Sequence, residues 1–446
     1  MIALADMTGK TYAVMGLDRS GLASVRALCA AGARVLADDD KPGQVEKAVA
    51  AGAIAAKLSE VPLEGVTALV LTPGIPHRLP RPHSVAARFI AANIPVIGDI
   101  ELFAQSHPAA RIVGITGTNG KSTTTALITH ILQSAGIEVA VGGNFGIGVL
   151  DLPVLPASGV YVLELSSYQL ERCPSLAVDV GIMLNLTSDH LDRHGDMAGY
   201  AEAKANLFAR PRGLAAAICG ADDEWSRAIG EKASANGFHF QVISVPQAGP
   251  LTEIKTLPGS HNWQNAEAAR LTCHTLGLDE AQILAGMTSY PGLDHRQQLV
   301  GTTQDIHFVN DSKATNADAT AKALGCYDNI YWIIGGKPKP GGLAGLEEFL
   351  PRIRHAFLIG EATEEFAAWL NGKITYERCG ELATATACAF ATALAEGHKD
   401  AVVLLSPACA SFDQFRSFEE RGVTFAALAR AICSPQEVAH ASLQSH

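Results

Sequence analysis

One short stretch of this sequence combines glycine, lysine and hydroxyl side chains at a spacing that suits phosphate chemistry. It reads Gly117-Thr118-Asn119-Gly120-Lys121-Ser122-Thr123, after an apolar run at 112–115 and before a helical pattern at 122–133. Backbone N–H groups at such a helix start can cradle an anion, Lys121 can reach the terminal phosphates, and the Ser122 hydroxyl can hold Mg²⁺. The common pattern GxxxxGK[ST] is not met, because Ile115 stands where its first glycine would fall. The sequence therefore predicts a phosphate-binding loop of a shorter type.

Groups that can bind a metal follow two other apolar runs in this region. Glu164 ends one such run, and His190 follows another, within the polar segment 185–194. The carboxyl ends of parallel strands meet at one edge of a sheet, and carboxylate oxygens suit Mg²⁺. We therefore expect Glu164 to bind Mg²⁺ beside the phosphate loop with His190 near it, while a structural role for this lone histidine stays open. Lys204, on a predicted helix at 200–208, has no feature in the sequence that distinguishes it from a solvated surface charge.

Three segments farther along place polar residues at expected helix starts. Asn262 and Asn265 open an alanine-rich helix, where they could contact adenine or phosphate. The segment 310–316 follows a strand and begins a helix, so Thr315 could meet an anion at a helix N-terminus. The segment 406–418 follows another strand in the same way.

The first hundred residues contain a nucleotide-like pattern that differs from a dinucleotide site. The stretch Gly16-Leu17-Asp18-Arg19-Ser20-Gly21 follows a strand and opens a helix, and an acidic cluster at 38–40 ends the next strand. Asp18 stands at the second glycine position of GxGxxG, where the backbone must approach a pyrophosphate closely. A uridine nucleotide fits better than a dinucleotide, with Asp38 accepting a hydrogen bond from the base or ribose. A Rossmann-like domain without a ligand stays open as the alternative.

These residues must be positioned by strands that run in the same direction. Short apolar runs alternate with alanine-rich helical stretches along nearly the whole chain, which indicates an α/β fold with parallel sheets. Three domains are expected, over 1–99, 100–298 and 299–446. Strands are predicted at 12–16, 33–37, 68–71 and 95–97 in the first domain, at 112–115, 160–165 and 180–186 in the second, and at 306–310, 330–334, 356–359 and 402–405 in the third.

The composition limits the kinds of partner. Of the 446 residues, 48% are hydrophobic, which suffices for several packed cores. With 34 basic and 45 acidic residues the net charge is −11, which argues against nucleic acid or an acidic membrane surface as a partner. Nine scattered cysteines without a CxxC pair indicate neither a zinc ribbon nor a disulfide framework, and fit a reducing cytosol. The N-terminus lacks a signal-peptide pattern and no uncharged run is long enough to span a bilayer, so a cytoplasmic protein without membrane insertion is expected.

Seven motifs together carry a resemblance to a known family. They are GTNGKST, LELSSYQLE, NLTSDHLDRH, HNWQNA, LDHR, NDSKATN and LLSPACASFDQF, in this order and spacing. The chain resembles the Mur ligase superfamily over essentially its whole length. The resemblance implies a Rossmann-like N-terminal domain for a UDP-sugar, a central P-loop ATPase-type domain with a mostly parallel sheet, and a Rossmann-like C-terminal domain for an amino acid.

Within the superfamily, the segments GDIELF and LSPACAS favour the members that add D-glutamate to UDP-N-acetylmuramoyl-L-alanine. The resemblance then implies a cytoplasmic, monomeric, ATP-dependent ligase of peptidoglycan precursor synthesis that forms an amide bond through an acyl phosphate, with two Mg²⁺ ions. A sister ligase, or one like folylpolyglutamate synthase that adds another amino acid, is the alternative of the same class. Two other classes stay in view: a nicotinamide dehydrogenase, against which the missing GxGxxG argues, and a nucleotide sensor that binds ATP without releasing phosphate.

The resemblance also implies roles for individual residues. ATP binding falls to Gly117, Thr118, Asn119, Gly120, Lys121, Ser122, Thr123, Asn265, Arg296 and Asp311. Catalysis and Mg²⁺ binding fall to Lys121, Ser122, Glu164, His190 and Lys204, the last as the carbamate that the family forms on this lysine. The UDP-substrate is expected to contact Arg19, Ser20, Gly21, Asp38, Thr72, Asn144, Ser166 and Gln169. D-Glutamate is expected to contact Lys313, Thr315, Ser411, Phe418 and Lys339, with Lys337 as the alternative because both lysines lie in the loop 335–340.

Overall fold

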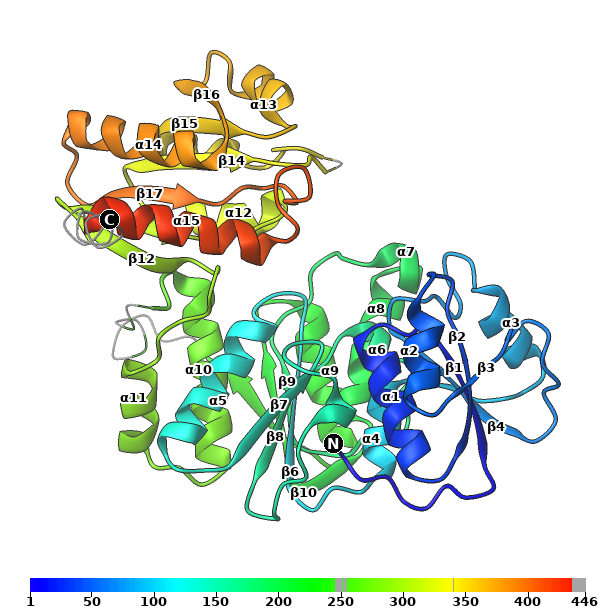
Figure 1. Cartoon of the computed structure of the whole chain (residues 1–446). Helices are drawn as coiled ribbons and strands as arrows, with labels where there is room; N and C mark the ends of the chain where they lie inside the picture. The colour runs from blue at the N-terminus through cyan, green and yellow to red at the C-terminus, as the bar shows by residue number, and fades with distance from the viewer. Residues whose placement is uncertain (245–250, 252–253, 255, 340, 435–446) are drawn as a thin grey trace, which may run out of the picture. The chain divides into compact units, whose positions relative to one another are not determined.

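The computed structural model describes residues 1–244, 251, 254, 256–339 and 341–434. The chain divides into two compact units, one of Met1–Thr252 with Asn262–Tyr290, and one of Glu253–His261 with Pro291–His446. Unit 1 contains two β-sheets and unit 2 contains one, and all three are drawn in Figure 1. No helix within the described ranges has both the length and the apolar character needed to cross a bilayer.

The first sheet of unit 1 is a five-stranded parallel sheet with the strand order of a Rossmann-like fold. The order is β3 (Ile54–Ala55), β2 (Arg34–Asp38), β1 (Thr11–Met15), β4 (Val66–Leu71) and β5 (Val96–Ile97). Its helices are α1 (Arg19–Ala30), α2 (Gln44–Ala50), α3 (Ser84–Ala91) and α4 (Asp99–Gln105). The strands are apolar because helices cover both faces, as in other parallel sheets.

The second sheet of unit 1 has six strands, all parallel. The order is β11 (His239–Ile243), β10 (Pro211–Gly220), β9 (Val178–Met183), β6 (Arg111–Thr116), β8 (Val160–Glu164) and β7 (Val139–Gly143). Its helices are α5 (Lys121–Ser134), α6 (Ser167–Leu170), α7 (Leu191–His194), α8 (Met197–Ala205), α9 (Glu224–Ala235), α10 (Ser260–Thr275) and α11 (Glu280–Thr288). Figure 1 shows α5 and α9 on opposite sides of this sheet.

The two sheets of unit 1 share one hydrophobic core. Val14 of the first sheet and Ile112 of the second belong to the same buried cluster, together with Leu102 and Phe103 of α4. Phe103 meets Tyr161 of β8 edge to face, with ring centroids 5.2 Å apart. Removing this much apolar surface from water favours one compact unit, since about 25 cal/mol is gained per Å² of apolar surface buried.

Unit 2 has a six-stranded sheet that is parallel except at one edge. The order is β12 (Gln298–Thr303), β13 (Ile306–Asn310), β17 (Ala401–Leu405), β14 (Ile330–Gly335), β15 (Ile353–Ile359) and β16 (Tyr376–Gly380), with β12 antiparallel to β13. Helices α14 (Leu382–Glu396) and α15 (Phe418–Cys433) share a core on one face, and α12 (Ala317–Leu324) and α13 (Thr363–Leu370) share another on the opposite face.

The α/β fold class predicted from the sequence is confirmed, and each predicted apolar run lies on a strand. Six strands were not predicted: β3, β7, β10, β11, β12 and β16. Five of these, all except β10, lie at sheet edges, where half of the backbone groups are unpaired and the apolar pattern is weak. The helix predicted at 200–208 is two elements, because α8 ends at Ala205 and a 3₁₀ turn, Asn206–Phe208, follows it.

Candidate active site

The phosphate loop joins β6 to α5 and is shaped by its glycines. Gly120, at φ 85°, lies where an added Cβ would collide with the Asn265 side chain, so only glycine fits. Lys121 begins α5, and its Nζ donates to the carbonyl oxygens of Gly117 and Thr118, each at 2.8 Å. The ammonium group therefore lies over the loop, in the position from which a lysine meets a phosphate.

The segment after β9 holds this loop in place. Asn185 accepts a hydrogen bond from the backbone N of Asn119 at 2.9 Å, and its carbonyl oxygen accepts from the backbone N of Thr118 at 2.8 Å. The Thr118 hydroxyl donates to the carbonyl oxygen of Thr187 at 3.2 Å. Because β6 and β9 are neighbours in the sheet, the loops after them meet at one edge.

Glu164 ends β8 beside the phosphate loop, since it pairs in register with Ile115 of β6. Its side chain is buried, and Oε1 accepts from Nδ2 of Asn144 at 2.6 Å. Its Oε2 is buried without a hydrogen-bond partner in the described part of the chain. A buried carboxylate oxygen without a donor is costly unless a cation meets it, so Glu164 fits a Mg²⁺ ligand.

Lys204 is almost completely buried, with an exposed fraction of 1%. Its Nζ donates to the carbonyl oxygen of Gly117 at 2.9 Å and to Oγ1 of Thr116 at 3.2 Å, and lies 4.8 Å from the ring centroid of Tyr200. No carboxylate among the described residues forms an ion pair with it. Burial, and then the nearby charge of Lys121, lower the pKa of Lys204 well below its ordinary value, so the neutral amine is favoured.

His190 precedes α7 in a left-handed conformation, φ 53°, and its side chain is 45% exposed. Burial lowers its pKa; the Asp189 carboxylate opposes this shift, whereas the charges of Lys204 and Lys121 reinforce it. The neutral imidazole that results is the form that binds metals. The structure thus brings His190, Glu164 and Lys204 into the surroundings of the phosphate loop.

Asn265 of α10 lies under the same loop. It is buried, its Oδ1 accepts from the Thr124 hydroxyl at 3.3 Å, and its Nδ2 donates to Oδ1 of Asn262 at 3.1 Å. These hydrogen bonds hold the Asn265 side chain between α5 and the start of α10.

The residues expected to face the UDP-substrate fall into two groups. Arg19, Ser20, Gly21, Asp38 and Thr72 lie at the ends of β1, β2 and β4 or at the start of α1. Asn144, Ser166 and Gln169 lie after β7 and β8, next to Glu164.

Several of these side chains already have partners inside the protein. Arg19 donates to the carbonyl oxygen of Gly146 at 2.6 Å. Asp38 accepts from the backbone N of Leu58 at 2.8 Å. Ser166 and Gln169 form a capping box at the start of α6, in which each side chain accepts from the backbone N–H of the other.

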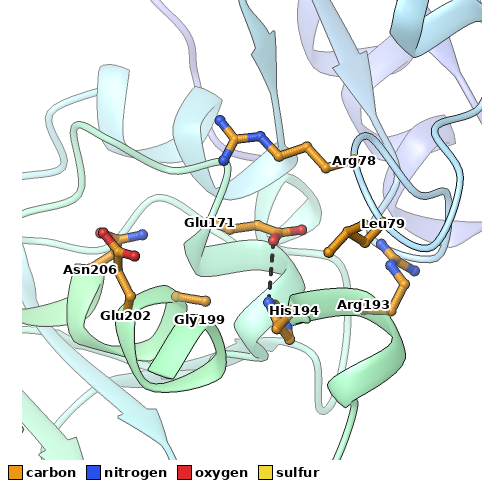
Figure 2. Close-up of a pocket in the computed structure, with 9 residues that line it drawn as sticks. Arg78, Leu79, Glu171, Arg193, His194, Gly199, Glu202 and Asn206 are labelled. Atoms are coloured by element: carbon orange, nitrogen blue, oxygen red, sulfur yellow. Dashed lines mark ion pairs between the residues drawn. The ribbon is translucent and has the colours of Figure 1, made fainter. Parts of the chain in front are cut away.

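A cavity of about 320 Å³ lies next to this region, shown in Figure 2. It is lined by Arg78, Leu79, Glu171, Arg193, His194, Gly199, Glu202, Ala203 and Asn206. Glu171 lies 3.3 Å from Nδ1 of His77 and 3.6 Å from Nδ1 of His194, and the second pair is dashed in Figure 2. Burial opposes ionisation, but the hydrogen bond and charge of His77 lower the pKa of Glu171.

In unit 2, Asp311 follows β13 and is buried. Its carboxylate accepts from the Ser406 hydroxyl at 2.9 Å and from the backbone N of Gln297 at 3.2 Å. Burial raises the pKa of Asp311 to about 7, against the lowering effect of Ser406, Gln297 and the charge of Arg296. Arg296 therefore lies within electrostatic reach of this carboxylate.

The two lysines of the loop 335–340 make different contacts, one through its side chain and the other through its backbone. Lys339 donates from Nζ to Oγ1 of Thr315 at 3.4 Å, which joins two of the residues expected at the D-glutamate site. Lys337 forms a backbone bridge to Ala410, beside the buried Ser411. Pro340, at the end of this loop, lies outside the described residues.

Phe418 begins α15, and Nζ of Lys313 lies 5.0 Å from its ring centroid. Arg421, one turn later, is 1% exposed and was not singled out in the sequence. Its guanidinium donates to Oγ and the carbonyl oxygen of Ser312 at 3.0 and 2.8 Å, and to the carbonyl oxygen of Cys409 at 3.1 Å. Arg421 thereby ties the loop after β13 to the loop after β17.

Comparison with known proteins places this geometry in a family. Residues 115–255 match the Mur ligase middle domain. A UDP-N-acetylmuramoylalanine–D-glutamate ligase of Paramagnetospirillum magneticum is 50% identical, over 97% of this chain and 98% of the relative. Ligases of the same name from Rhodospirillum rubrum and Caulobacter are 46% and 44% identical, over at least 95% of both chains.

The chain belongs to the Mur ligases, among the UDP-N-acetylmuramoylalanine–D-glutamate ligases. It is therefore an enzyme of the ligase class.

Solved structures of other Mur ligases support the fold alone. A UDP-N-acetylmuramate–alanine ligase from Thermotoga maritima superposes with a TM-score of 0.55 at 15% identity, over 95% of this chain and 99% of that one. A UDP-N-acetylmuramoylalanyl-D-glutamyl-2,6-diaminopimelate–D-alanyl-D-alanyl ligase from Acinetobacter baumannii also has a TM-score of 0.55, at 19% identity, over 90% of both chains. The resemblance to Mur ligases seen in the sequence motifs is confirmed by the curated relatives and the family match above.

For a Mur ligase site, sequence reasoning missed residues that position others. Asn185 clamps the phosphate loop, Glu171 and His194 line the cavity, and Arg421 joins two loops of unit 2. All three of Asn185, Glu171 and His194 lie within the motifs NLTSDHLDRH and LELSSYQLE, and for Asn185 the place just after strand β9 was an available signal. Glu171 and His194 lie at the ends of the short helices α6 and α7. Arg421 lies on a helix among charged residues, where nothing local distinguishes it from a surface arginine.

Proposed function

We propose that this Mur ligase joins D-glutamate to UDP-N-acetylmuramoyl-L-alanine, with ATP as co-substrate, in peptidoglycan precursor synthesis. The observation that carries the proposal is the identity of 44–50% over nearly the full length to relatives named for this reaction. The buried amine of Lys204 beside the phosphate loop supports it, because a group at this place can serve the phosphates or the metal ions of the reaction.

The reaction would proceed in two steps. A carboxylate oxygen of UDP-N-acetylmuramoyl-L-alanine attacks the γ-phosphorus of ATP, the bond from that phosphorus to the β–γ bridging oxygen breaks, and ADP leaves. The amine of D-glutamate then attacks the acyl carbon of the acyl phosphate, the carbon–oxygen bond to phosphate breaks, and the nitrogen loses a proton. Phosphoryl transfer of this kind needs positioning and charge stabilisation more than covalent help from the protein.

The loop residues 117–123 would hold the phosphates of ATP through their N–H groups, and Lys121 would stabilise the charge of the transferring phosphoryl group. Asn265, Arg296 and Asp311 are proposed to contact the nucleotide. Asp311 is proposed in this role although its carboxylate already accepts two hydrogen bonds within unit 2.

Ser122, Glu164, His190 and the modified Lys204 are proposed to hold two Mg²⁺ ions. When bound, these ions neutralise the phosphate oxygens around the transferring group. The buried, unpartnered Oε2 of Glu164 is the feature of this chain that fits a cation most directly.

Lys204 is proposed to act as a carbamate. Its neutral Nζ, favoured by burial and by the charge of Lys121, would attack the carbon of CO₂ and release a proton. A buried neutral amine would then become an anionic oxygen ligand for Mg²⁺.

The substrates are proposed to be recognised by the two sets of residues described above. The UDP-substrate would contact Arg19, Ser20, Gly21, Asp38, Thr72, Asn144, Ser166 and Gln169. D-Glutamate would contact Lys313, Thr315, Ser411 and Phe418, and Lys339 would bind its side-chain carboxylate, because Lys339 already meets Thr315. We further propose a cytoplasmic monomer whose three domains span 1–99, 100–298 and 299–446.

The test is phosphate release from ATP and Mg²⁺ with UDP-N-acetylmuramoyl-L-alanine, across a panel of D- and L-amino acids. We expect release only with D-glutamate, and none when either co-substrate is left out. Comparable turnover with L-lysine or meso-diaminopimelate would assign the chain to a sister reaction. ATP binding without phosphate release under any of these conditions would instead support a sensor.

A further inference from the structure

Two cysteines and a glutamate meet where strand β16 packs on helix α14, and none of the three belongs to the proposed ligase site. The donor atoms of Glu377, Cys379 and Cys388 all lie within 4.8 Å of one another. Cys388 Sγ donates to Oε1 of Glu377 at 3.6 Å. Cys379 and Cys388 are both free thiols and both half-buried, and Glu377 is exposed.

The fold explains why these residues meet. Glu377 and Cys379 are two residues apart on β16, so both side chains point to the same face of the sheet. Helix α14 covers that face, and Cys388 lies on it, packed with Cys379 against the core that contains Phe357 and Ala385. The sequence spacing of nine residues does not form a CxxC motif, so only this strand–helix contact brings the thiols together.

This set of donors favours one class of cation. Two sulfur ligands and one carboxylate suit Zn²⁺ or Cd²⁺, whereas Mg²⁺ prefers oxygen ligands alone. Three protein ligands leave a fourth position, which water can fill because Glu377 faces solvent. The site would therefore discriminate against the Mg²⁺ that the ligase reaction uses.

The local charges also favour a cation. Arg378, between Glu377 and Cys379, alternates to the other face of β16, where it pairs with Glu364 at 2.9 Å. His355 lies on the neighbouring strand β15, where its ring stacks on that of Phe357 of the same strand, and its Nε2 is buried without a hydrogen-bond partner among the described residues. Burial lowers the pKa of His355, and the charges of Glu377 and Glu396 oppose this shift, so Glu377 lies within electrostatic reach of a neutral imidazole.

We propose that Glu377, Cys379 and Cys388 form a binding site for a thiophilic divalent cation, Zn²⁺ in the cell. Binding would displace the thiol protons and join the edge strand β16 to α14. The bound ion would stabilise unit 2, because a ligand that binds only the folded state raises the free energy of unfolding.

The experiment uses Cd²⁺ as the probe on the untagged full-length protein, kept reduced by a phosphine. We expect about one equivalent of Cd²⁺ to bind, with the ultraviolet charge-transfer band of cadmium thiolates, and to raise the thermal midpoint. The double variant Cys379→Ser/Cys388→Ser should lose the band and the shift in midpoint. The matched control Cys29→Ser/Cys433→Ser, which replaces two other half-buried thiols, should retain both.

Two further measurements keep the result clear. Glu377→Gln should weaken Cd²⁺ binding by about tenfold or more while preserving two thiolate contacts. Circular dichroism and ligase turnover of the Cys379→Ser/Cys388→Ser variant, measured without Cd²⁺, should match those of the parent, which excludes misfolding as the cause. A parent protein with no thiolate band, or a band that survives in this double variant, would overturn the proposal.

Discussion

Replacement of Arg421 by methionine should destabilise unit 2. This side chain is buried at the start of α15 and makes three hydrogen bonds of 3.1 Å or less, to Ser312 and to Cys409. The substitution keeps much of the volume but removes every donor. The carbonyl oxygens of Ser312 and Cys409 would then lose a buried partner, which is costly because water does not replace it.

The expected magnitude follows from two opposing effects. A hydrogen bond to a charged group contributes about 1.5–3 kcal/mol, so three contribute about 4.5–9 kcal/mol. Burial lowers the pKa of Arg421 to about 10, which corresponds to a desolvation penalty of about 3 kcal/mol that the neutral methionine does not have. The difference predicts a loss of about 1.5–6 kcal/mol in the free energy of unfolding.

Urea unfolding followed by tryptophan fluorescence measures this loss, because Trp332 is completely buried in the sheet of unit 2. The matched control is Arg430→Met, an exposed position in the last turn of the same helix, where a change of only a few tenths of a kcal/mol is expected. If Arg421→Met changes the free energy of unfolding no more than Arg430→Met does, the role assigned to the buried guanidinium is refuted.

Substitutions at other positions test the proposed site. Lys121→Ala should lower turnover by about 10²–10³-fold with little effect on unfolding, and near-native turnover would show that the nucleotide site is misassigned. Lys204→Ala should lose most activity, with partial recovery in acetate, whereas Lys204→Arg should stay inactive because a guanidinium forms no carbamate; full activity of the alanine variant would exclude the metal role. Lys339→Ala should raise the D-glutamate KM about ten- to a hundredfold, from a contact of roughly 1.5–3 kcal/mol, and an unchanged KM with a raised value for Lys337→Ala would transfer the role. The pKa of Asp311, raised to about 7 by burial, means that the folded protein keeps a proton that the unfolded chain releases above about pH 4; the free energy of unfolding of the ligand-free parent should therefore fall between about pH 4 and about pH 7 relative to Asp311→Asn, and parallel pH profiles would contradict this.

The phosphate loop could be predicted because its signal is local. Glycines at 117 and 120, the lysine that follows and the helical pattern after it are all contiguous, and each has a conformational or chemical reason of its own. Glu164 could be predicted for a similar reason, since an apolar run that ends in a carboxylate places that group at the edge of a parallel sheet.

Ser166 and Gln169 show where local information was ambiguous. Their spacing, S-x-x-Q, is that of a capping box, and the structure contains this capping box at the start of α6. The resemblance implied only that these two side chains contact the UDP-substrate. A side chain that caps a helix can still contact a ligand through its other atoms, so the two roles are compatible.

What the sequence determines by itself here is the order of chemical groups along parallel strands, and with it the fold class, the phosphate loop and the family. What only the tertiary structure decides is which groups are removed from water and which distant groups meet. Lys204 reads as a surface lysine, but α8 places its Nζ against Thr116, 88 residues earlier in the chain. Arg421 has the local sequence of an exposed helix residue, but in the structure it is buried against the loops after β13 and β17. Cys379 and Cys388 meet only because α14 packs on β16. Burial depends on contacts between segments far apart in the chain, so no pattern of neighbouring residues encodes it.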